Sequence, residues 1–542
     1  MIKEDGQMFA IEDERVSRVR YALFDQNPCE LSFSYVLDWA GISSADIDQV
    51  AGNDYLLEPY FRAVREGDIS GSHISRINQG KFPPLIFLNH HLTHAYSTFF
   101  TCPYDEAAIL VADGTGSLTS QKTTPPQRET MTYSVGRLNT ITTIGSVKGE
   151  STGSSFSPEY PPLFNNSLGH MYRAVTQILG FGWMNAGKTM GLAPYGDDRY
   201  VKEVMRYIHL LPKGQYEIRI GGSDGMLARL IQLRKEGRSK NDHFKVDAAL
   251  AHGVQTTLEN VLFHALDYLW EETNTTNLCF AGGIALNSLF NGKIPERTKF
   301  KNIHVFFAPG DCGTAIGAAI WDYLRRRESS GDRIRFDSGP FLGRQYTEDV
   351  MKNALDEYGL ISMPYINLYQ EAAQLIAQGK TLAWFEGGAE FGPRALGHRS
   401  ILADPRDPKM LDRINKDIKG REWFRPIAPA VIESAATTYF KAECYSPYMQ
   451  FVWPVREQYR ASLPAITHID GSSRIHTVRK RGNESLYALL EAFDQITGFP
   501  ILINTSFNVQ GNPIVETPQQ AIEAFLSSGL DVLILGKYFI QK

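Results

Sequence analysis

Short apolar runs and longer amphipathic stretches alternate along the first two thirds of the chain. The runs at 107–112 and 303–307 are continuous apolar segments of the length expected for buried β-strands. Residues 131–144 contain two segments in which apolar and polar positions alternate, as they do in the strands of a meander. Residues 168–179 and 246–271 instead repeat apolar side chains at helical spacing. This alternation of strands and helices predicts an α/β fold.

The chain is 542 residues long, which is too long for one hydrophobic core and predicts at least two domains. Between Arg325 and Arg344 the sequence becomes polar and rich in glycine and serine. Such stretches are typical of domain boundaries. We therefore expect one domain at residues 1–343 and a second at 344–542.

Two histidines and two aspartates stand at positions typical of a metal site. His90 and His94 are four residues apart in a helix-compatible segment, so their imidazoles would share one face. Asp113 follows the apolar run at 107–112, and Asp311 follows the run at 303–307. Each aspartate thus lies where a strand ends in a glycine turn, a usual place for a ligand in an α/β sheet.

The histidine pattern by itself is weak, because paired histidines also occur on solvated or packed helix faces. His91 could also be the partner of His94 in another geometry. The metal-site hypothesis therefore depends on the two aspartates as much as on the histidines.

Two glycine-containing segments are candidates for phosphate binding. Gly282 and Gly283 follow a strand, and the N-terminus of the next helix would favour an anion there. The segment 187–191 also has two glycines, and Lys188 would add a positive charge. Neither segment is a Walker A loop, and for each one alone a tight packing turn is the simpler explanation.

The second half carries a local excess of basic residues. Residues 391–426 contain nine Lys or Arg against five Asp or Glu, and arginine forks suit phosphate binding. A solvated helix face is the simpler explanation for Arg406, Lys409 and Arg413. Arg394 and Arg425 stand beside prolines in aromatic, glycine-containing loops, which favours a built pocket. Farther on, an apolar strand leads to Ser506 and Asn508, which could either cap a turn or donate hydrogen bonds to a ligand.

Composition narrows the class of protein. Hydrophobic content of 43% and charged content of 21% are ordinary for a soluble globular protein. The net charge of −5 gives no reason to expect nucleic acid or an anionic membrane as a partner. No signal peptide or membrane-spanning run is evident, and the five cysteines lack CxxC spacing. We therefore expect a cytoplasmic protein with reduced thiols, which could form an oligomer.

Taken together, the motifs of this chain resemble those of the NodU/CmcH family of O-carbamoyltransferases. The motifs that carry the resemblance, over nearly the whole chain, are His-His-Leu-Thr-His (90–94), Gly-Lys-Thr-Met-Gly-Leu-Ala-Pro-Tyr-Gly (187–196), Ala-Gly-Gly-Ile-Ala-Leu-Asn (281–287), Phe-Gly-Pro-Arg-Ala-Leu-Gly (391–397), Phe-Arg-Pro (424–426) and Asn-Thr-Ser-Phe-Asn (504–508). The resemblance implies an actin-like ATPase (ASKHA) domain similar to the tRNA threonylcarbamoyl transferase, followed by a YrdC-like domain.

The resemblance also implies a reaction in two steps. The YrdC-like domain would convert carbamoyl phosphate and ATP, with Mg(II), into carbamoyl adenylate and pyrophosphate. The first domain would then transfer the carbamoyl group to a hydroxyl of a small molecule, with AMP as the leaving group. The residues implied in binding carbamoyl phosphate and nucleotide in the second domain are Arg394, Lys419, Arg425, Arg474, Ser506 and Asn508. Of these, Lys419 and Arg425 are also expected to act in catalysis.

In the first domain the resemblance assigns His90, His94, Asp113 and Asp311 as ligands of a divalent metal. Fe(II), with Mn(II) or Zn(II) as alternatives, suits two imidazoles and two carboxylates. Gly282, Gly283 and Asn287 resemble the nucleotide-contacting turn of the family, and Lys188 lies in a second such motif.

Two departures from the family pattern concern the catalytic acid–base groups. The first strand of the actin-like core and its loop are expected to be missing, so the sequence does not identify the general base. Ser117 stands where relatives tend to have glutamate. Two alternatives remain at this point, a tRNA threonylcarbamoyl transferase and a degenerate, non-catalytic binding protein. The acceptor itself has no diagnostic motif.

Overall fold

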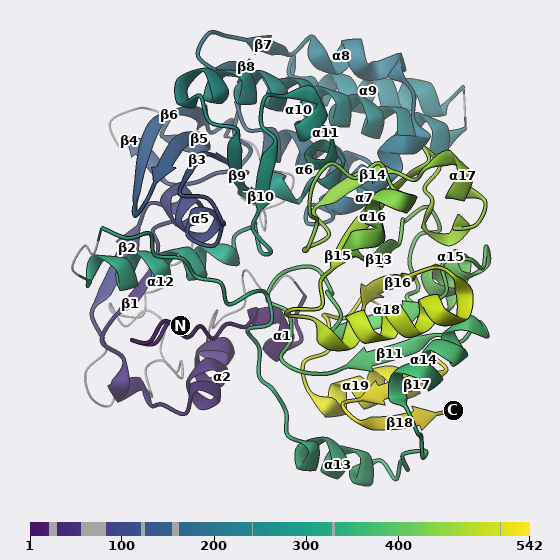
Figure 1. Ribbon diagram of the computed structural model, residues 1–542. Helices are drawn as coiled ribbons and strands as arrows, with labels where there is room; N and C mark the ends of the chain where they lie inside the picture. Colours follow the sequence, from purple (N-terminus) through teal and green to yellow (C-terminus); the bar gives the residue numbers. More distant parts are fainter. Residues whose placement is uncertain are drawn as a thin grey trace. The chain divides into compact units, whose positions relative to one another are not determined.

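The computed structural model describes residues 1–20, 30–55, 83–120, 125–153, 155, 162–240, 242–327, 331–509 and 511–542. These residues form two compact units. Unit 1 contains Met1–Asp46 and Ser338–Lys542, and unit 2 contains described residues from Ile47 to Asp337. Both units combine sheets and helices, so the predicted α/β class is confirmed (Figure 1). None of the described helices combines the length and the apolar composition that crossing a membrane requires.

Unit 2 is built around a mixed six-stranded sheet. Its strand order is β10-β9-β3-β5-β4, with β6 pairing β5; β3, β9 and β10 run parallel to one another. Further two-stranded sheets pair β1 with β2 and β7 with β8. The strands are β1 (Val50–Asn53), β2 (Leu85–Leu88), β3 (Glu106–Ala112), β4 (Leu118–Ser120), β5 (Gln127–Arg137), β6 (Thr140–Glu150), β7 (Ile208–Leu210), β8 (Tyr216–Ile218), β9 (Asn277–Ala281) and β10 (Asn302–Val305).

The helices of unit 2 pack around this sheet (Figure 1). They are α5 (His90–Phe99), α6 (Leu168–Ile178), α7 (Ala186–Leu192), α8 (Val201–Met205), α9 (Met226–Arg238), α10 (His243–Thr273), α11 (Ser288–Arg297) and α12 (Gly313–Arg325). The longest, α10, contacts α6, α7, α8, α9 and β3, and most of its apolar side chains are buried. The helices predicted at 168–179 and 246–271 and the strands predicted at 107–112 and within 131–144 are all present.

Unit 1 contains an eight-stranded mixed sheet of order β14-β15-β13-β16-β12-β11-β17-β18. The strands are β11 (Leu382–Phe385), β12 (Arg399–Ala403), β13 (Ala428–Ile432), β14 (Phe451–Pro454), β15 (Ser472–Val478), β16 (Ile501–Ser506), β17 (Val532–Leu535) and β18 (Tyr538–Gln541). The helices are α1 (Asp13–Ser17), α2 (Glu30–Ala40), α13 (Glu348–Glu357), α14 (Leu368–Ala377), α15 (Met410–Asp412), α16 (Glu433–Tyr439), α17 (Glu457–Arg460), α18 (Glu484–Thr497) and α19 (Pro518–Leu526). Helices α14 and α18 pack together on the sheet and form one core with it.

The N-terminal segment joins unit 1 through a buried arginine. Arg15 is fully buried, and its guanidinium donates hydrogen bonds to the carbonyl oxygens of Glu390 and Gly392 at 3.2 and 3.1 Å. Residues 1–46 therefore pack with the C-terminal half, whereas the sequence had placed them in a domain at 1–343. The boundary also falls at Ser338 and not at residue 344. The physical reason is that this packing depends on contacts between residues more than 370 positions apart, which local patterns do not show.

Candidate metal centre and anion-binding site

The helix α5 presents two imidazoles to one point. Asn89 caps this helix, and its side-chain oxygen accepts the N–H of Leu92 at 2.8 Å. His90 and His94 lie one turn apart and are fully buried, with ring centroids 4.8 Å apart. The predicted helical spacing is therefore present, and both histidines face the same side of the helix.

Two aspartates complete the cluster from the ends of parallel strands. Asp113 directly follows β3, and Asp311 lies in the turn between β10 and α12. The Nε2 atom of His90 is 3.1 Å from Oδ2 of Asp113 and 3.5 Å from Oδ1 of Asp311. The Nε2 atom of His94 is 3.5 and 3.6 Å from the same two oxygens. All four donor atoms lie within 4.8 Å of one another.

This arrangement fits a divalent cation. A tetrahedral site with bonds of about 2.1 Å has ligand atoms about 3.4 Å apart, close to the separations between the imidazole nitrogens and carboxylate oxygens. Within the described residues, His94 Nε2 and Asp311 Oδ1 are buried without a hydrogen-bond partner. Buried polar atoms without partners are costly unless a ligand satisfies them. The four side chains predicted from sequence thus form one group that could hold a metal ion.

The pKa shifts of the cluster also fit a site that could hold a metal ion. Burial alone would lower the pKa of His90, but the neighbouring carboxylates of Asp113 and Asp311 outweigh it and raise the pKa to about 10. Burial would raise the pKa of Asp113, yet the two histidines hold it well below its ordinary value. The carboxylates therefore stay ionised at neutral pH. A bound cation would replace the proton between the imidazoles and the carboxylates.

Backbone amides orient the carboxylate of Asp113. Its Oδ1 accepts the N–H of Gly114 at 2.7 Å and that of Gly283 at 3.1 Å, which leaves Oδ2 for the histidines. Gly282 has a φ of +91°, and a Cβ there would lie 2.2 Å from the carbonyl oxygen of Ala112. The predicted turn at Gly282 and Gly283 is present, and it has a structural role at the metal cluster. Its contact with a nucleotide stays a prediction.

Asn287 and Lys188 have local partners in unit 2. The side chain of Asn287 caps α11 by accepting the N–H of Phe290, and it exchanges hydrogen bonds with Gln255. Lys188 lies within α7, and its Nζ is 5.9 Å from the ring centroid of Phe181. The expected glycine turn at 187–191 is therefore wrong, because this segment is helical. Ligand contacts of both side chains stay predictions.

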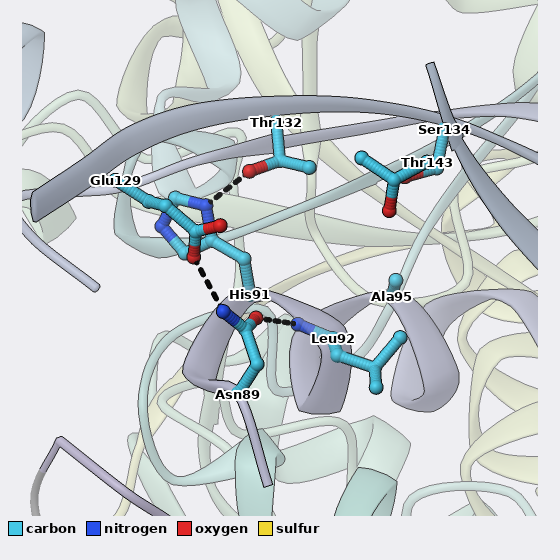
Figure 2. Close-up of a pocket in the computed structure, with 8 residues that line it drawn as sticks. All are labelled: Asn89, His91, Leu92, Ala95, Glu129, Thr132, Ser134 and Thr143. Carbon is cyan, nitrogen blue, oxygen red and sulfur yellow. Dashed lines mark hydrogen bonds between the residues drawn. The ribbon is translucent and has the colours of Figure 1, made fainter. Parts of the chain in front are cut away.

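His91 faces away from the metal cluster and lines a separate cavity. Its Nδ1 lies 2.7 Å from Oγ1 of Thr132, and burial lowers its pKa to about 3. The alternative in which His91 pairs with His94 as a ligand is therefore wrong. The cavity has a volume of about 170 Å³. Figure 2 shows the residues that line it, on α5 and strands β5 and β6. Its lining residues are Asn89, His91, Leu92, Ala95, Glu129, Thr132, Ser134 and Thr143.

In unit 1, a buried lysine connects two of the predicted donors. The Nζ of Lys419 donates hydrogen bonds to Oγ of Ser506 at 3.0 Å and to Oδ1 of Asn508 at 2.8 Å. Ser506 ends β16, and Asn508 follows it. Burial, together with Arg421 and Arg425, lowers the pKa of Lys419 well below its ordinary value. The sequence therefore brings Lys419, Ser506 and Asn508 together, as predicted.

Several arginines surround this lysine. Arg474, on β15, is half-buried among cations. Desolvation and then the charges of Arg394, Arg421 and Arg425 lower its pKa well below the ordinary value. Arg421 has its pKa lowered to about 9 by burial and by Arg425. Like charges gathered in this way are unfavourable unless an anion offsets them. The cluster thus has the charge expected of a phosphate-binding site.

Arg421 was not among the residues expected to bind a ligand. Its Nε donates to Oδ1 of Asn415 at 2.7 Å, which fixes the guanidinium beside the other arginines. The sequence signal was present, since Arg421 lies within the basic stretch at 391–426. By contrast, Arg406 and Arg413 of the same stretch form ion pairs with Asp404 and Asp531, both at 2.7 Å. These two arginines therefore have partners outside the cluster.

Comparison with family models gives two matches. Residues 51–320 match the model described as "Carbamoyltransferase N-terminus", and residues 373–542 match "Carbamoyltransferase C-terminus". Together they include all four residues of the metal cluster and all the predicted residues of the cation cluster.

Among curated proteins, the chain is similar to nodulation protein NolNO of Sinorhizobium fredii. The two are 34% identical over 568 residues, which cover 100% of this chain and 78% of that protein. It is also similar to nodulation protein NolO of Bradyrhizobium diazoefficiens, with 36% identity over 84% of this chain and 79% of that protein.

A search of solved structures finds weaker likeness. Full-length HypF in its phosphate- and nucleotide-bound form is 14% identical, covers 56% of this chain and 51% of that chain, and has a TM-score of 0.36. The family assignment depends instead on the curated relatives and the family models. They support a carbamoyl-transferring enzyme against the non-catalytic alternative. The chain belongs to the carbamoyltransferase family and is a carbamoyltransferase.

Proposed function

We propose that this carbamoyltransferase is ATP-dependent and acts through carbamoyl adenylate on a hydroxyl group of a small natural product. In this proposal residues 338–542 include the YrdC-like part, and unit 2 corresponds to the actin-like, threonylcarbamoyl-transferase-like part. The observation that carries the proposal is the group formed by His90, His94, Asp113 and Asp311, because a hydroxyl acceptor is a poor nucleophile and needs an activated centre.

The first half-reaction takes place in unit 1. Carbamoyl phosphate, ATP and water give carbamoyl adenylate, pyrophosphate and inorganic phosphate, with Mg(II) accompanying the triphosphate. The cation cluster around Lys419 supplies the positive charge that holds two anionic substrates close together. Arg394, Arg425 and Arg474 bind phosphate oxygens. Ser506 and Asn508 keep the Lys419 ammonium in place.

The second half-reaction takes place in unit 2. The acceptor oxygen forms a bond to the carbamoyl carbon, the bond from that carbon to the AMP oxygen breaks, and the hydroxyl proton passes to solvent or a base. His90, His94, Asp113 and Asp311 would hold Fe(II), or alternatively Mn(II) or Zn(II). A metal ion there would supply Lewis acidity at the reacting centre. The backbone amides of Gly114 and Gly283 keep Asp113 oriented toward the cluster.

Separate assays of the two half-reactions test the proposal. Pyrophosphate release from ATP plus carbamoyl phosphate reports the first, and the mass increase of a hydroxylated acceptor reports the second. We expect His94→Ala to abolish transfer and to leave pyrophosphate release intact. We expect Arg425→Ala to abolish pyrophosphate release. His209→Ala, an exposed histidine of unit 2, is the matched control and should change neither.

Two results would contradict the proposal. Equal loss of both half-reactions in His94→Ala would show that the metal cluster is not confined to transfer. Failure of the unaltered protein to release pyrophosphate would exclude the adenylate route, and the carbamoyl donor would then have to react directly.

A further inference from the structure

The N-terminal turns of α6 are packed tightly on the turn that carries Asp113. A Cβ added at Gly169 would lie 2.7 Å from both Cα and N of Gly114, so only glycine allows this approach. Ser167 caps the helix, and its Oγ donates to the carbonyl oxygen of Gly114 at 2.5 Å. These two contacts fix α6 against the metal-binding turn.

Arg173 lies one helical turn after Gly169 and therefore on the same face of α6. Its NH1 is 3.8 Å from the point where a Cβ on Gly114 would lie. Its NH2 is 4.0 Å from the corresponding point on Gly283. The guanidinium thus reaches both glycine turns, which follow the parallel strands β3 and β9.

The same geometry places Arg173 near, but not on, the metal ligands. The Cβ position of Gly283 is also 2.9 Å from Oδ1 of Asp113, the oxygen that faces away from the histidines. Within the described part of the chain, no carboxylate forms an ion pair with Arg173 and no acceptor receives a hydrogen bond from its guanidinium. The side chain is half-buried, so its guanidinium is not fully surrounded by bulk solvent.

The other polar group on this face does not compete for an anion. His170 is buried, and its Nδ1 accepts the backbone N–H of Phe164 at 3.1 Å. Burial and the charge of Arg173 lower the pKa of His170 to about 3, so the imidazole is neutral. Arg173 is therefore the cation at this side of the glycine turns. A planar guanidinium with free donors is suited to phosphate oxygens.

We propose that Arg173 binds the phosphate of a nucleoside monophosphate, the AMP part of carbamoyl adenylate, beside the metal centre. This inference rests on the proposed function and adds a residue to it. When the bond between the carbamoyl carbon and the AMP oxygen breaks, negative charge increases on that phosphate. Arg173 stabilises this charge, so its contribution is greater to leaving-group departure than to acceptor binding.

The test measures AMP binding by the full-length chain, by isothermal titration calorimetry. The starting protein for this test, called the parent, carries Arg425→Ala. This substitution removes a key arginine of the unit 1 cluster, so that AMP binding to unit 2 dominates the calorimetric signal. We expect Arg173→Gln in this parent to weaken AMP binding at least tenfold and to leave adenosine binding unchanged. Arg173→Lys should restore part of the affinity. Arg206→Gln, an exposed arginine of unit 2, is the control and should bind AMP like the parent.

A kinetic readout separates this role from a merely structural one. With Arg425 intact, Arg173→Gln should release pyrophosphate at the normal rate, and its kcat for transfer should fall at least tenfold with an unchanged KM for the acceptor. Unchanged AMP affinity in Arg173→Gln would overturn the inference and leave the proposed function standing. Absence of AMP binding in the parent would overturn both the inference about Arg173 and the proposed function. A rise in acceptor KM alone would assign Arg173 to the acceptor and also refute it.

Discussion

Gly317 provides the sharpest test of how the fold positions the metal cluster. This residue lies on α12, which begins just after Asp311, and it packs on α5, which carries both histidines. A Cβ at Gly317 would be 1.8 Å from the carbonyl oxygen of Thr93 and 3.1 Å from the backbone N of Ser97. The contact is with backbone, so no rotamer change relieves it.

The substitution Gly317→Ala must therefore move α12 away from α5. Lengthening the 1.8 Å approach to an ordinary contact needs a shift of roughly 1.6 Å, while metal sites tolerate errors of about 0.2 Å in ligand distances. Overpacking of this kind costs about 3 kcal/mol, and the better helix propensity of alanine returns about 1 kcal/mol. We expect a net loss of about 2 kcal/mol in the stability of unit 2 and at least tenfold weaker metal binding.

The assay combines thermal unfolding with titration of the metal-free protein by Co(II), whose absorption reports its ligand geometry. Gly187→Ala is the matched control: Gly187 is exposed on α7, and an added Cβ would meet nothing within 4 Å. That variant should be as stable as the unaltered protein or slightly more so, with unchanged Co(II) affinity. Normal stability and normal Co(II) binding in Gly317→Ala would refute the argument that close helix packing sets the ligand geometry.

Three further predictions concern unit 1. Arg15→Ala removes one of the cations that act on the buried Glu390, while Arg399 remains. We expect a cost of about 3 kcal/mol in unfolding free energy, measured by urea denaturation; an unchanged midpoint would contradict this role. Burial raises the pKa of Glu386 to about 7. The contribution of this carboxyl to folding stability is therefore most favourable below the unfolded pKa near 4.5 and is lost as pH rises to 7. Glu386→Gln should flatten the dependence of stability on pH across that window, and an unchanged slope would count against this role. Burial and neighbouring cations lower the pKa of Lys419, so the binding of pyrophosphate should be accompanied by proton uptake. Calorimetry should show this uptake as a binding enthalpy that depends on the ionisation enthalpy of the buffer. Lys419→Gln should remove that dependence.

The metal cluster was predictable because its signals are local. The spacing of His90 and His94 fixes a shared helix face, and Asp113 and Asp311 each follow a strand. Parallel strands bring their C-terminal ends to one edge of a sheet, and β3 and β10 are separated there by β9 alone. Periodicity and turn signals thus indicated the four side chains, and the resemblance to the carbamoyltransferase family assigned them to one site.

The features that the sequence did not reveal depend on long-range packing. Arg173 looks like an ordinary polar position on an amphipathic helix, and only the close approach of Gly169 to Gly114 gives it a role. The segment 187–191 was expected to be a turn because it has two glycines, yet tertiary contacts with α6 and α10 support a helix there. Arg15 forms its bonds with residues in the other half of the chain. No local pattern contains that information.

The packing of the first 46 residues against the C-terminal half has a consequence for biosynthesis. The ribosome makes this segment before the C-terminal half, and its binding surface around Glu390 emerges only after more than 370 further residues. At about 5–20 residues per second, the delay is on the order of 20–70 s. During that time Arg15, fully buried in the finished protein, lacks the carbonyl oxygens of Glu390 and Gly392 that accept its hydrogen bonds, so this segment cannot complete its packing until the C-terminal half has been made.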